Sequence, residues 1–261
     1  MSKFAPWFLL LMVLLPGRSA AVRDSTVSTH DLEQRWRAFL QDDSSSRPAG
    51  TFPYADCFNK SATAHGLPES LLLAVARGES DFDPQARSSA DAYGLMQILW
   101  PQTARHLGIH SLVELTDPCT NVDAGARYLK ELLGRYQGNL HRALAAYNYG
   151  PGRVPTSGGR VPEGAVWYSG YIHRHLEHVL NAKGSGRGRL FLIAFQRPYR
   201  AAAFVDSVQP AMQGIRLDWF RRPQGAFVVV MSYDSRDELS RGRRLLSQLG
   251  LSAGRDPGVT E

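Results

Sequence analysis

Cysteine is scarce in this sequence, which has two such residues, Cys57 and Cys119, among 261. A metal centre built on thiolates needs further ligands at close spacing, and neither cysteine has a partner of that kind nearby. In an oxidising compartment an even pair of cysteines favours a disulfide. We therefore expect a Cys57–Cys119 disulfide, with two separate buried thiols as the alternative.

A long apolar run is also missing. A membrane-spanning helix needs about 20 apolar residues, and the apolar run at 8–15 is too short for one. Lys3 precedes this run and small residues follow it, which is the layout of a secretory signal peptide at 1–21, cleaved after Ala21. No cysteine follows closely enough for lipid attachment. We expect the mature chain to be exported and to have no stable membrane span.

Lysine is absent after position 183. The residues from Gly184 onward hold 12 arginines and 7 acidic residues, so most of the formal net charge of +6 lies in this part of the chain. A basic region suits an acidic polymer or surface as a partner, and an arginine-rich surface that only contacts solvent is the alternative. We do not expect nucleic acid as a partner.

The chain divides at two linkers. Residues 22–53 form an N-terminal extension with a short helix at 31–41 and a serine-rich linker, and a glycine-rich linker lies at 184–188. Between them, the domain at 54–183 is mostly helical. Apolar periodicity and capping residues predict helices at 54–65, 68–80, 121–136, 140–148 and 167–182.

Two segments of this domain are not helical by pattern. The turn-rich segment 91–98 indicates irregular or weakly β structure, which would form the opposite wall of a cleft. The loop 149–164 holds five glycines and three prolines, which exclude the interior of a helix.

Beyond the second linker, the apolar period changes from that of helices to that of strands. In the domain at 189–253 we predict strands at 190–195, 215–220 and 226–231 and helices at 201–212 and 236–249, with 254–261 as a tail. The order βαββα is that of a small split-βαβ, ferredoxin-like sandwich. The fold class is therefore α+β, a mainly α domain followed by a small α+β domain.

One glutamate lies in an apolar helical pattern. Within the predicted helix 68–80, Leu71, Val75 and Glu79 are four residues apart and share one face. Burial disfavours an ionised carboxylate and raises its pKa, and a carboxylic acid that stays protonated near neutral pH can donate a proton to a leaving oxygen. Glu79 is therefore a candidate general acid. On spacing alone, a helix-end glutamate paired with a nearby arginine is the alternative.

A series of short motifs continues from Glu79 through the helical region. They are Glu79-Ser80, Gly94-Leu95-Met96-Gln97-Ile98, Asp117-Pro118, Asn121, Tyr128-Leu129, Ala146-Tyr147-Asn148 and Gly170-Tyr171-Ile172. With these motifs in this order, the stretch from Cys57 to Leu176 resembles the catalytic domain of soluble lytic transglycosylases, the goose-lysozyme-like enzymes that cut bacterial peptidoglycan. With its flanking cysteines, it also looks like the small transglycosylases that accompany secretion and pilus systems.

The resemblance implies a lysozyme-like fold, a periplasmic location and a lyase activity on peptidoglycan glycan strands. Glu79 would protonate the glycosidic oxygen between N-acetylmuramic acid and N-acetylglucosamine. It would then act as a base on the 6-hydroxyl of the muramic acid and close a 1,6-anhydro ring. A hydrolase of the retaining or inverting kind needs a second carboxylate, whereas here the nucleophile belongs to the substrate. Further partners would be a secretion or pilus apparatus or a divisome component.

The same resemblance assigns the other site residues. Ser80 would steady the carboxyl group and the sugar, Met96 and Gln97 would line the groove, Tyr147 and Asn148 would contact the sugar, and Tyr171 would hydrogen-bond Glu79. No cofactor is implied. We expect no metal either, because His173, His175 and His178 lack nearby acids in register on their helix.

The domain at 189–253 looks similar to the sporulation-related repeat domain (SPOR-like), which binds glycan strands. A protein-docking module of the same layout is the alternative. For the whole chain, the other two functions to be weighed are a hydrolysing muramidase and a non-catalytic peptidoglycan-binding scaffold of an envelope-spanning secretion system.

Overall fold

Helix α3, Glu69–Ser80, is the central element of the helical domain, because every residue from Ser70 to Ser80 is buried. The computed structural model describes residues 29–181, 188–222 and 225–254. The predicted signal peptide at 1–21 lies outside these residues, as do most of the linker 184–188 and of the tail. Within the described part, no helix is both long and apolar enough to cross a membrane.

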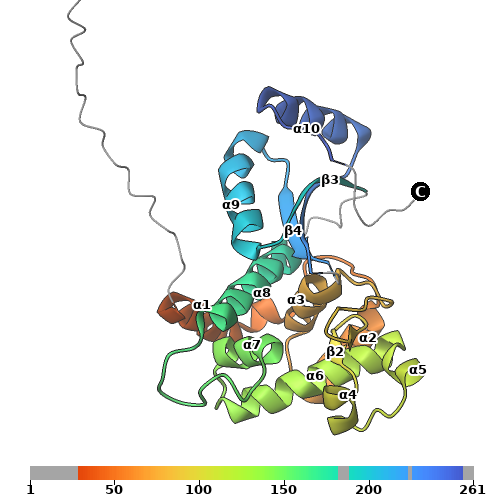
Figure 1. Ribbon diagram of the computed structural model, residues 1–261, viewed down its shortest axis with the longest axis vertical. Coiled ribbons are helices and arrows are strands. Elements are labelled where there is room, and N and C mark those ends of the chain that lie inside the picture. The colour runs from red at the N-terminus through yellow and green to blue at the C-terminus, as the bar shows by residue number, and fades with distance from the viewer. Residues whose placement is uncertain (1–28, 182–187, 223–224, 255–261) are drawn as a thin grey trace, which may run out of the picture.

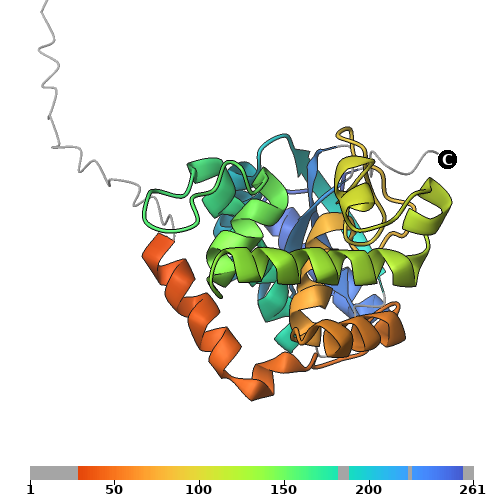
Figure 2. The ribbon, with the colours of Figure 1, turned by 90° about the horizontal axis from the view of Figure 1, so that it is seen from below.

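Longer helices surround α3. They are α1 (Thr29–Gln41), α2 (Ala55–His65), α6 (Pro118–Arg135), α7 (Leu140–Tyr149) and α8 (Glu163–Asn181). Helix α8 makes the most extensive packing contact with α3 and also packs on α7, and Figure 2 shows α6 lying across the domain. The five helices predicted for 54–183 are therefore present. The predicted start of α8 at 167 was four residues late.

Several short elements complete the domain. They are the 3-10 helix η1 (Asp43–Ser46), the strands β1 (Ala92–Tyr93) and β2 (Ile98–Leu99), and the helices α4 (Gln102–His106) and α5 (Leu112–Leu115). The two strands pair antiparallel, with Ala92 opposite Leu99, which confirms weak β structure at 91–98. Helices α4 and α5 were not predicted, because four or five residues are too few to show a helical period.

The N-terminal helix belongs to the core. Trp36 and Phe39 of α1 are buried, as is Phe52, and the indole Nε1 of Trp36 donates to Ser169 Oγ of α8 at 2.7 Å. The description of 22–53 as an extension and linker is therefore incomplete. Residues 29–53 close one side of the helical domain.

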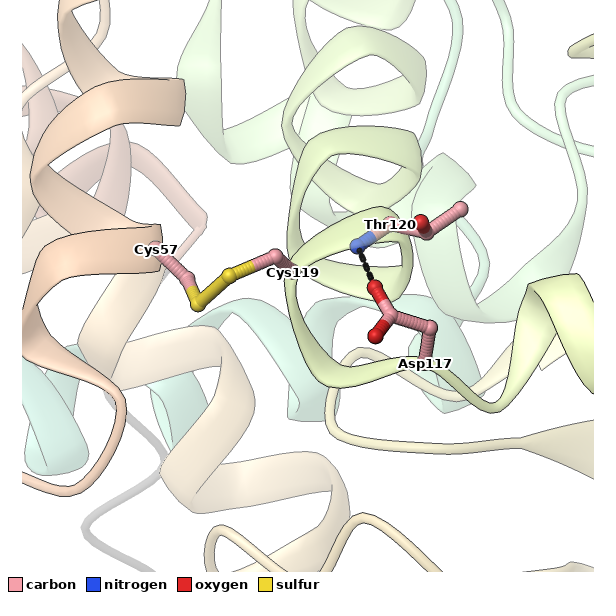
Figure 3. The surroundings of a disulfide bond; sticks show 4 residues. All are labelled: Cys57, Asp117, Cys119 and Thr120. Atoms are coloured by element: carbon pink, nitrogen blue, oxygen red, sulfur yellow. Dashed lines mark hydrogen bonds between the residues drawn. A yellow bond between two sulfur atoms is a disulfide. The ribbon is translucent and has the colours of Figure 1, made fainter.

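The start of α6 corrects a predicted helix cap. Asp117 is the N-cap, and its carboxylate accepts a hydrogen bond from Thr120 N at 2.8 Å, while Pro118 occupies the first turn, where a missing N–H costs nothing. The predicted cap, Asn121, lies inside the helix and is buried. Next to this cap, the predicted disulfide joins Cys57 of α2 to Cys119 of α6, with the Cα atoms 4.9 Å apart (Figure 3).

We expect replacement of both cysteines by serine to lower the free energy of unfolding by up to about 4 kcal/mol, because the bond closes a loop of that length in the unfolded chain. The loop is set by a sequence separation of 62 residues. Urea unfolding of the double variant measures the loss, and the reduced wild type should match it. Equal stability of the oxidised wild type and the double variant would contradict this prediction.

The C-terminal unit follows the predicted order βαββα. Its elements are β3 (Gly188–Phe195), α9 (Pro198–Val208), the 3-10 helix η2 (Gln209–Met212), β4 (Leu217–Arg221), β5 (Phe227–Tyr233) and α10 (Arg236–Gln248). The sheet order is β3-β5-β4, and both pairs are antiparallel, so the third strand lies between the two that α9 connects.

The C-terminal unit packs on the helical domain. Figure 1 shows α9 and α10 above the sheet and α3 and α8 below it. Alternate residues of β5 join different clusters: Phe227, Val229 and Met231 belong to the large core that continues into the helical domain, whereas Val228 and Val230 belong to a small separate cluster. Because the large core is continuous, the two predicted domains share apolar contacts.

Candidate active site

Glu79 lies in the last turn of α3 and is only 6% exposed. Its Oε1 accepts a hydrogen bond from the hydroxyl of Tyr168 in α8. Burial raises the pKa of Glu79, while the Tyr168 hydrogen bond and the charge of Arg221 act in the opposite direction. The carboxyl group therefore keeps its proton to a higher pH than an exposed glutamate, as a general acid requires.

Two tyrosines of α8 share the support of this turn. The prediction that Tyr171 hydrogen-bonds Glu79 is wrong, since Tyr168 makes that bond. The Tyr171 hydroxyl instead donates to the carbonyl of Gly78 at 2.8 Å. Residues three apart on a helix lie on the same face, so the sequence offered no means of choosing between the two.

Ser80 and Gln97 hold the loop that faces Glu79. The hydroxyl of Ser80 donates to the carbonyl of Leu95 at 2.9 Å. The side-chain amide of Gln97 donates to the carbonyls of Gly94 and Ala86 at 3.0 and 3.1 Å, and Gln97 itself has a positive φ of 51°. Both side chains therefore fix the shape of the loop, and Gln97 remains partly exposed.

Met96 lies beneath this loop. The sequence placed its side chain in the groove, but it is fully buried, and a Cβ on Gly125 of α6 would lie 2.6 Å from Met96 Cβ. The main-chain N–H of Met96 donates to Asn121 Oδ1 at 2.8 Å, and the Asn121 amide donates to the carbonyls of Tyr93 and Leu115. Asn121 is thus a residue whose structural role the sequence reading missed.

Tyr147 and Asn148 lie at the end of α7 and are both partly exposed. The Tyr147 hydroxyl donates to the carbonyl of Met96 at 2.8 Å, and its ring lies 5.4 Å from that of Tyr128. Burial and the charge of Glu79 raise the pKa of Tyr147, so the hydroxyl stays protonated. The structure therefore brings Glu79, Tyr147, Tyr168 and the loop 94–97 together around one place.

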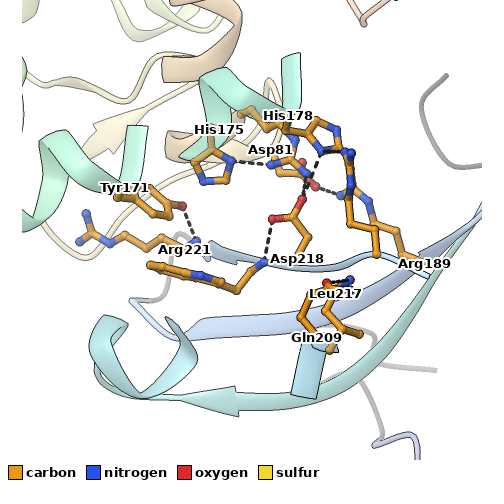
Figure 4. Close-up of polar contacts among 12 residues, drawn as sticks. Asp81, Tyr171, His175, His178, Arg189, Gln209, Leu217, Asp218 and Arg221 are labelled. Carbon is orange, nitrogen blue, oxygen red and sulfur yellow. Dashed lines mark hydrogen bonds and ion pairs between the residues drawn. The ribbon is translucent and has the colours of Figure 1, made fainter. Parts of the chain in front are cut away.

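The nearest other carboxylate in the sequence is already paired. Asp81 follows α3 and forms an ion pair with Arg189 of β3, and Figure 4 shows the two side chains meeting. No cluster of three or more histidine, cysteine or acidic side chains that could hold a metal occurs in the described residues. His173, His175 and His178 instead contact Glu177, Arg77 and Asp218, respectively.

A buried polar network lies behind Glu79. Arg77 of α3 is 2% exposed and pairs with Asp218 of β4, and its Nη1 lies 2.5 Å from His175 Nδ1. His178 Nδ1 lies 3.5 Å from Asp218 Oδ2. Burial alone would raise the pKa of Asp218, but the charges of Arg77 and the two histidines outweigh it and hold that pKa low.

We expect the protein to lose stability as the pH falls from about 6.5 towards about 4. Burial, followed by the charge of Arg77, lowers the pKa of His178 to about 4 and that of His175 well below its usual value. The unfolded chain therefore binds more protons in this window, and each histidine lowers the free energy of unfolding by up to about 1.4 kcal/mol per pH unit. Glu79 acts in the opposite direction, since its raised pKa gives the folded state the extra proton, but it is one group against two.

Urea unfolding between pH 7 and pH 4 checks this expectation, and the replacement His178→Gln should reduce the slope. A free energy of unfolding that stays level over this range would show that both histidines are already exposed to solvent in the folded protein.

Comparison with known proteins identifies the helical domain. Residues 56–168 match the family "Transglycosylase SLT domain", so this part of the chain is a transglycosylase SLT domain. Over 119 residues, the chain is 39% identical to the soluble lytic murein transglycosylase of Escherichia coli (strain K12), a match that covers 41% of this chain and 18% of that protein. It is 36% identical over 115 residues to the membrane-bound lytic murein transglycosylase C of Yersinia enterocolitica, which covers 39% and 32% of the two chains.

The chain thus spans less than a third of the length of these curated relatives. Among solved structures, it is similar to the 70 kDa soluble lytic transglycosylase of Escherichia coli, with 28% identity and a TM-score of 0.39 over 60% of this chain and 29% of that one. It is also similar to the lytic transglycosylase Slt of Pseudomonas aeruginosa, with 29% identity and a TM-score of 0.39 over 58% and 26% of the two chains. The family match ends at residue 168, and the SPOR-like resemblance of 189–253 stays a prediction.

Proposed function

We propose that this protein is an exported lytic transglycosylase that cleaves the β-1,4 bond between N-acetylmuramic acid and N-acetylglucosamine in peptidoglycan. The observation that carries the proposal is the buried carboxyl group of Glu79, with its raised pKa, at the end of α3 in a transglycosylase SLT domain. The curated relatives of this domain are named as murein transglycosylases, which supports the same substrate class here.

The chemistry needs one acid that later acts as a base. Glu79 donates its proton to the glycosidic oxygen, and the bond from C1 of the muramic acid to that oxygen breaks with its electron pair going to the leaving N-acetylglucosamine. The Glu79 carboxylate then takes the proton of the muramic acid 6-hydroxyl, whose oxygen bonds to C1 and closes the 1,6-anhydro ring. No water is consumed, and Glu79 regains its proton for the next cycle.

The surroundings of Glu79 support this single-acid route. The double-displacement and inverting routes of hydrolases both require a second carboxylate at a defined separation, and Asp81 is engaged with Arg189. Tyr168 donates to the carboxyl oxygen of Glu79, so it also stabilises the carboxylate that forms after proton transfer. Tyr147 and Asn148, half-exposed at the end of α7, would contact the sugar, and Ser80 and Gln97 would keep the groove wall in shape.

The product distinguishes this proposal from its rivals. We expect the full-length mature protein, incubated with purified sacculi, to release muropeptides that end in 1,6-anhydromuramic acid, as measured by mass spectrometry. Products that carry one additional water and a reducing muramic acid would identify a hydrolysing muramidase. Intact sacculi that nevertheless retain the protein in a pull-down would identify a non-catalytic wall-binding scaffold, and either result would overturn the proposal.

Location and partners belong to the same proposal. A signal peptide at 1–21 would deliver the protein to the periplasm, where its substrate lies, and the C-terminal unit would bind glycan strands or a partner from a secretion, pilus or division apparatus. A pull-down of the full-length Glu79→Gln protein with sacculi, with and without the additional replacement of Arg243 and Arg244 by glutamine, tests the glycan-binding role. Equal retention of the two proteins would show that these α10 arginines do not bind glycan.

A further inference from the structure

Strand β4 of the C-terminal unit is tied to the turn of α3 that carries Glu79. Asp218 of β4 pairs with Arg77. The main-chain N–H of Arg221 donates to the Tyr171 hydroxyl at 2.8 Å, and that hydroxyl donates to the carbonyl of Gly78 at 2.8 Å (Figure 4). Arg77 and Gly78 are the two residues directly before Glu79, so both are held in place by the same strand.

The side chain of Arg221 extends along Tyr171 in the direction away from Asp218 (Figure 4). Arg221 is half-buried, and no ion pair occupies its guanidinium among the residues that the structure describes. Arg77, the other arginine close to Glu79 in the chain, is neutralised by Asp218. Arg221 is therefore the cation whose charge is left to act on the carboxyl group.

The other titratable groups around Glu79 are neutral. Tyr147 from α7 and Tyr168 and Tyr171 from α8 all have raised pKa values, first because they are buried and also because of the charge of Glu79. The positive charge of Arg221 lowers the pKa of Glu79 against the larger effect of burial. The protonation of Glu79 thus depends on a residue that lies 142 positions later in the chain, outside the matched SLT residues 56–168.

We propose that β4 is part of the active site, with Arg221 as the cation that stabilises the carboxylate form of Glu79 and with Asp218 positioning the helix turn that carries it. Its meaning for catalysis rests on the proposed function. When Glu79 gives up its proton, a negative charge appears in a buried place, and a fixed positive charge nearby lowers the free energy of that state. Arg221 acts through Glu79 and is a positioning residue. The C-terminal unit is then required for the chemistry itself, whatever else it binds.

The test compares three substitutions in the full-length protein. Arg221→Gln removes the charge, Arg221→Lys keeps it, and Arg243→Gln removes the charge of an exposed arginine on α10 as the matched control. The titration of the Glu79 carboxyl carbon is followed by ¹³C NMR, with its signal assigned by its loss in Glu79→Gln. We expect Arg221→Gln to raise the titration midpoint by roughly 0.5 to 1 pH unit, Arg221→Lys to shift it less, and Arg243→Gln to leave it unchanged.

The alkaline limb of the pH–rate profile for release of anhydromuropeptides should move upward with the NMR midpoint. An unchanged midpoint in Arg221→Gln, or an equal shift in Arg243→Gln, would overturn the inference. The NMR measurement requires no turnover, so a wild-type protein that releases no anhydromuropeptides would refute the proposed function and leave the electrostatic result to be read separately.

Discussion

Replacement of Glu79 by glutamine is expected to lower the rate of anhydromuropeptide release by at least about 100- to 10,000-fold, the range for loss of a general acid or base. Glutamine has nearly the same shape and can still accept the Tyr168 hydrogen bond that Glu79 Oε1 receives, but it can neither donate a proton to the glycosidic oxygen nor take one from the 6-hydroxyl. Both steps depend on the same group, so no residual route through this side chain remains.

A matched control separates chemistry from folding. Asp83 is an exposed carboxylate in the loop directly after α3, and Asp83→Asn should leave the rate within about twofold, since exposed substitutions away from a site have small effects. The Glu79→Gln protein should also unfold at an unchanged or higher temperature above neutral pH, because it no longer has a buried carboxyl group that must be kept neutral. A Glu79→Gln protein that folds and still releases products at the wild-type rate would show that the acid lies elsewhere.

The parts of this site that the sequence predicted correctly are those with local signals. Glu79 follows Leu71 and Val75 on one helix face, and the period that places it inward is visible within 12 residues; it is indeed buried. The disulfide was predictable because two cysteines permit one pairing. The βαββα order was predictable because strand and helix periods alternate clearly after the glycine-rich linker.

The parts that it missed depend on contacts between distant segments. Asn121 looked like a helix cap, since the same residue type serves caps and loop anchors, and the true cap Asp117 lies four residues earlier. Arg77 in an apolar helix and Asp218 in an apolar strand each indicate a buried partner. However, the two are 141 residues apart, and no spacing rule pairs them. The dependence of Glu79 on the C-terminal unit was invisible for that reason.

The Arg77–Asp218 pair gives the second large expected effect. Asp218→Asn should lower the free energy of unfolding by about 3 to 5 kcal/mol, because it leaves a buried guanidinium without its counter-charge. The two side chains are 2% and 7% exposed, so water cannot replace the lost partner. Urea unfolding at pH 7 measures the change, and the same variant should release anhydromuropeptides more slowly if the turn before Glu79 loses its position.

A second pair between the two units serves as the control. Asp206 of α9 and Arg174 of α8 lie 3.3 Å apart, and their side chains are 62% and 35% exposed, so Asp206→Asn should cost less than about 1 kcal/mol. The double replacement Arg77→Met with Asp218→Leu should recover most of the stability that Asp218→Asn loses, since apolar side chains of similar size can replace a buried ion pair. If Asp218→Asn cost no more than Asp206→Asn, β4 would not be packed against α3 in solution. The activity of Glu79 would then have to be explained by the helical domain alone.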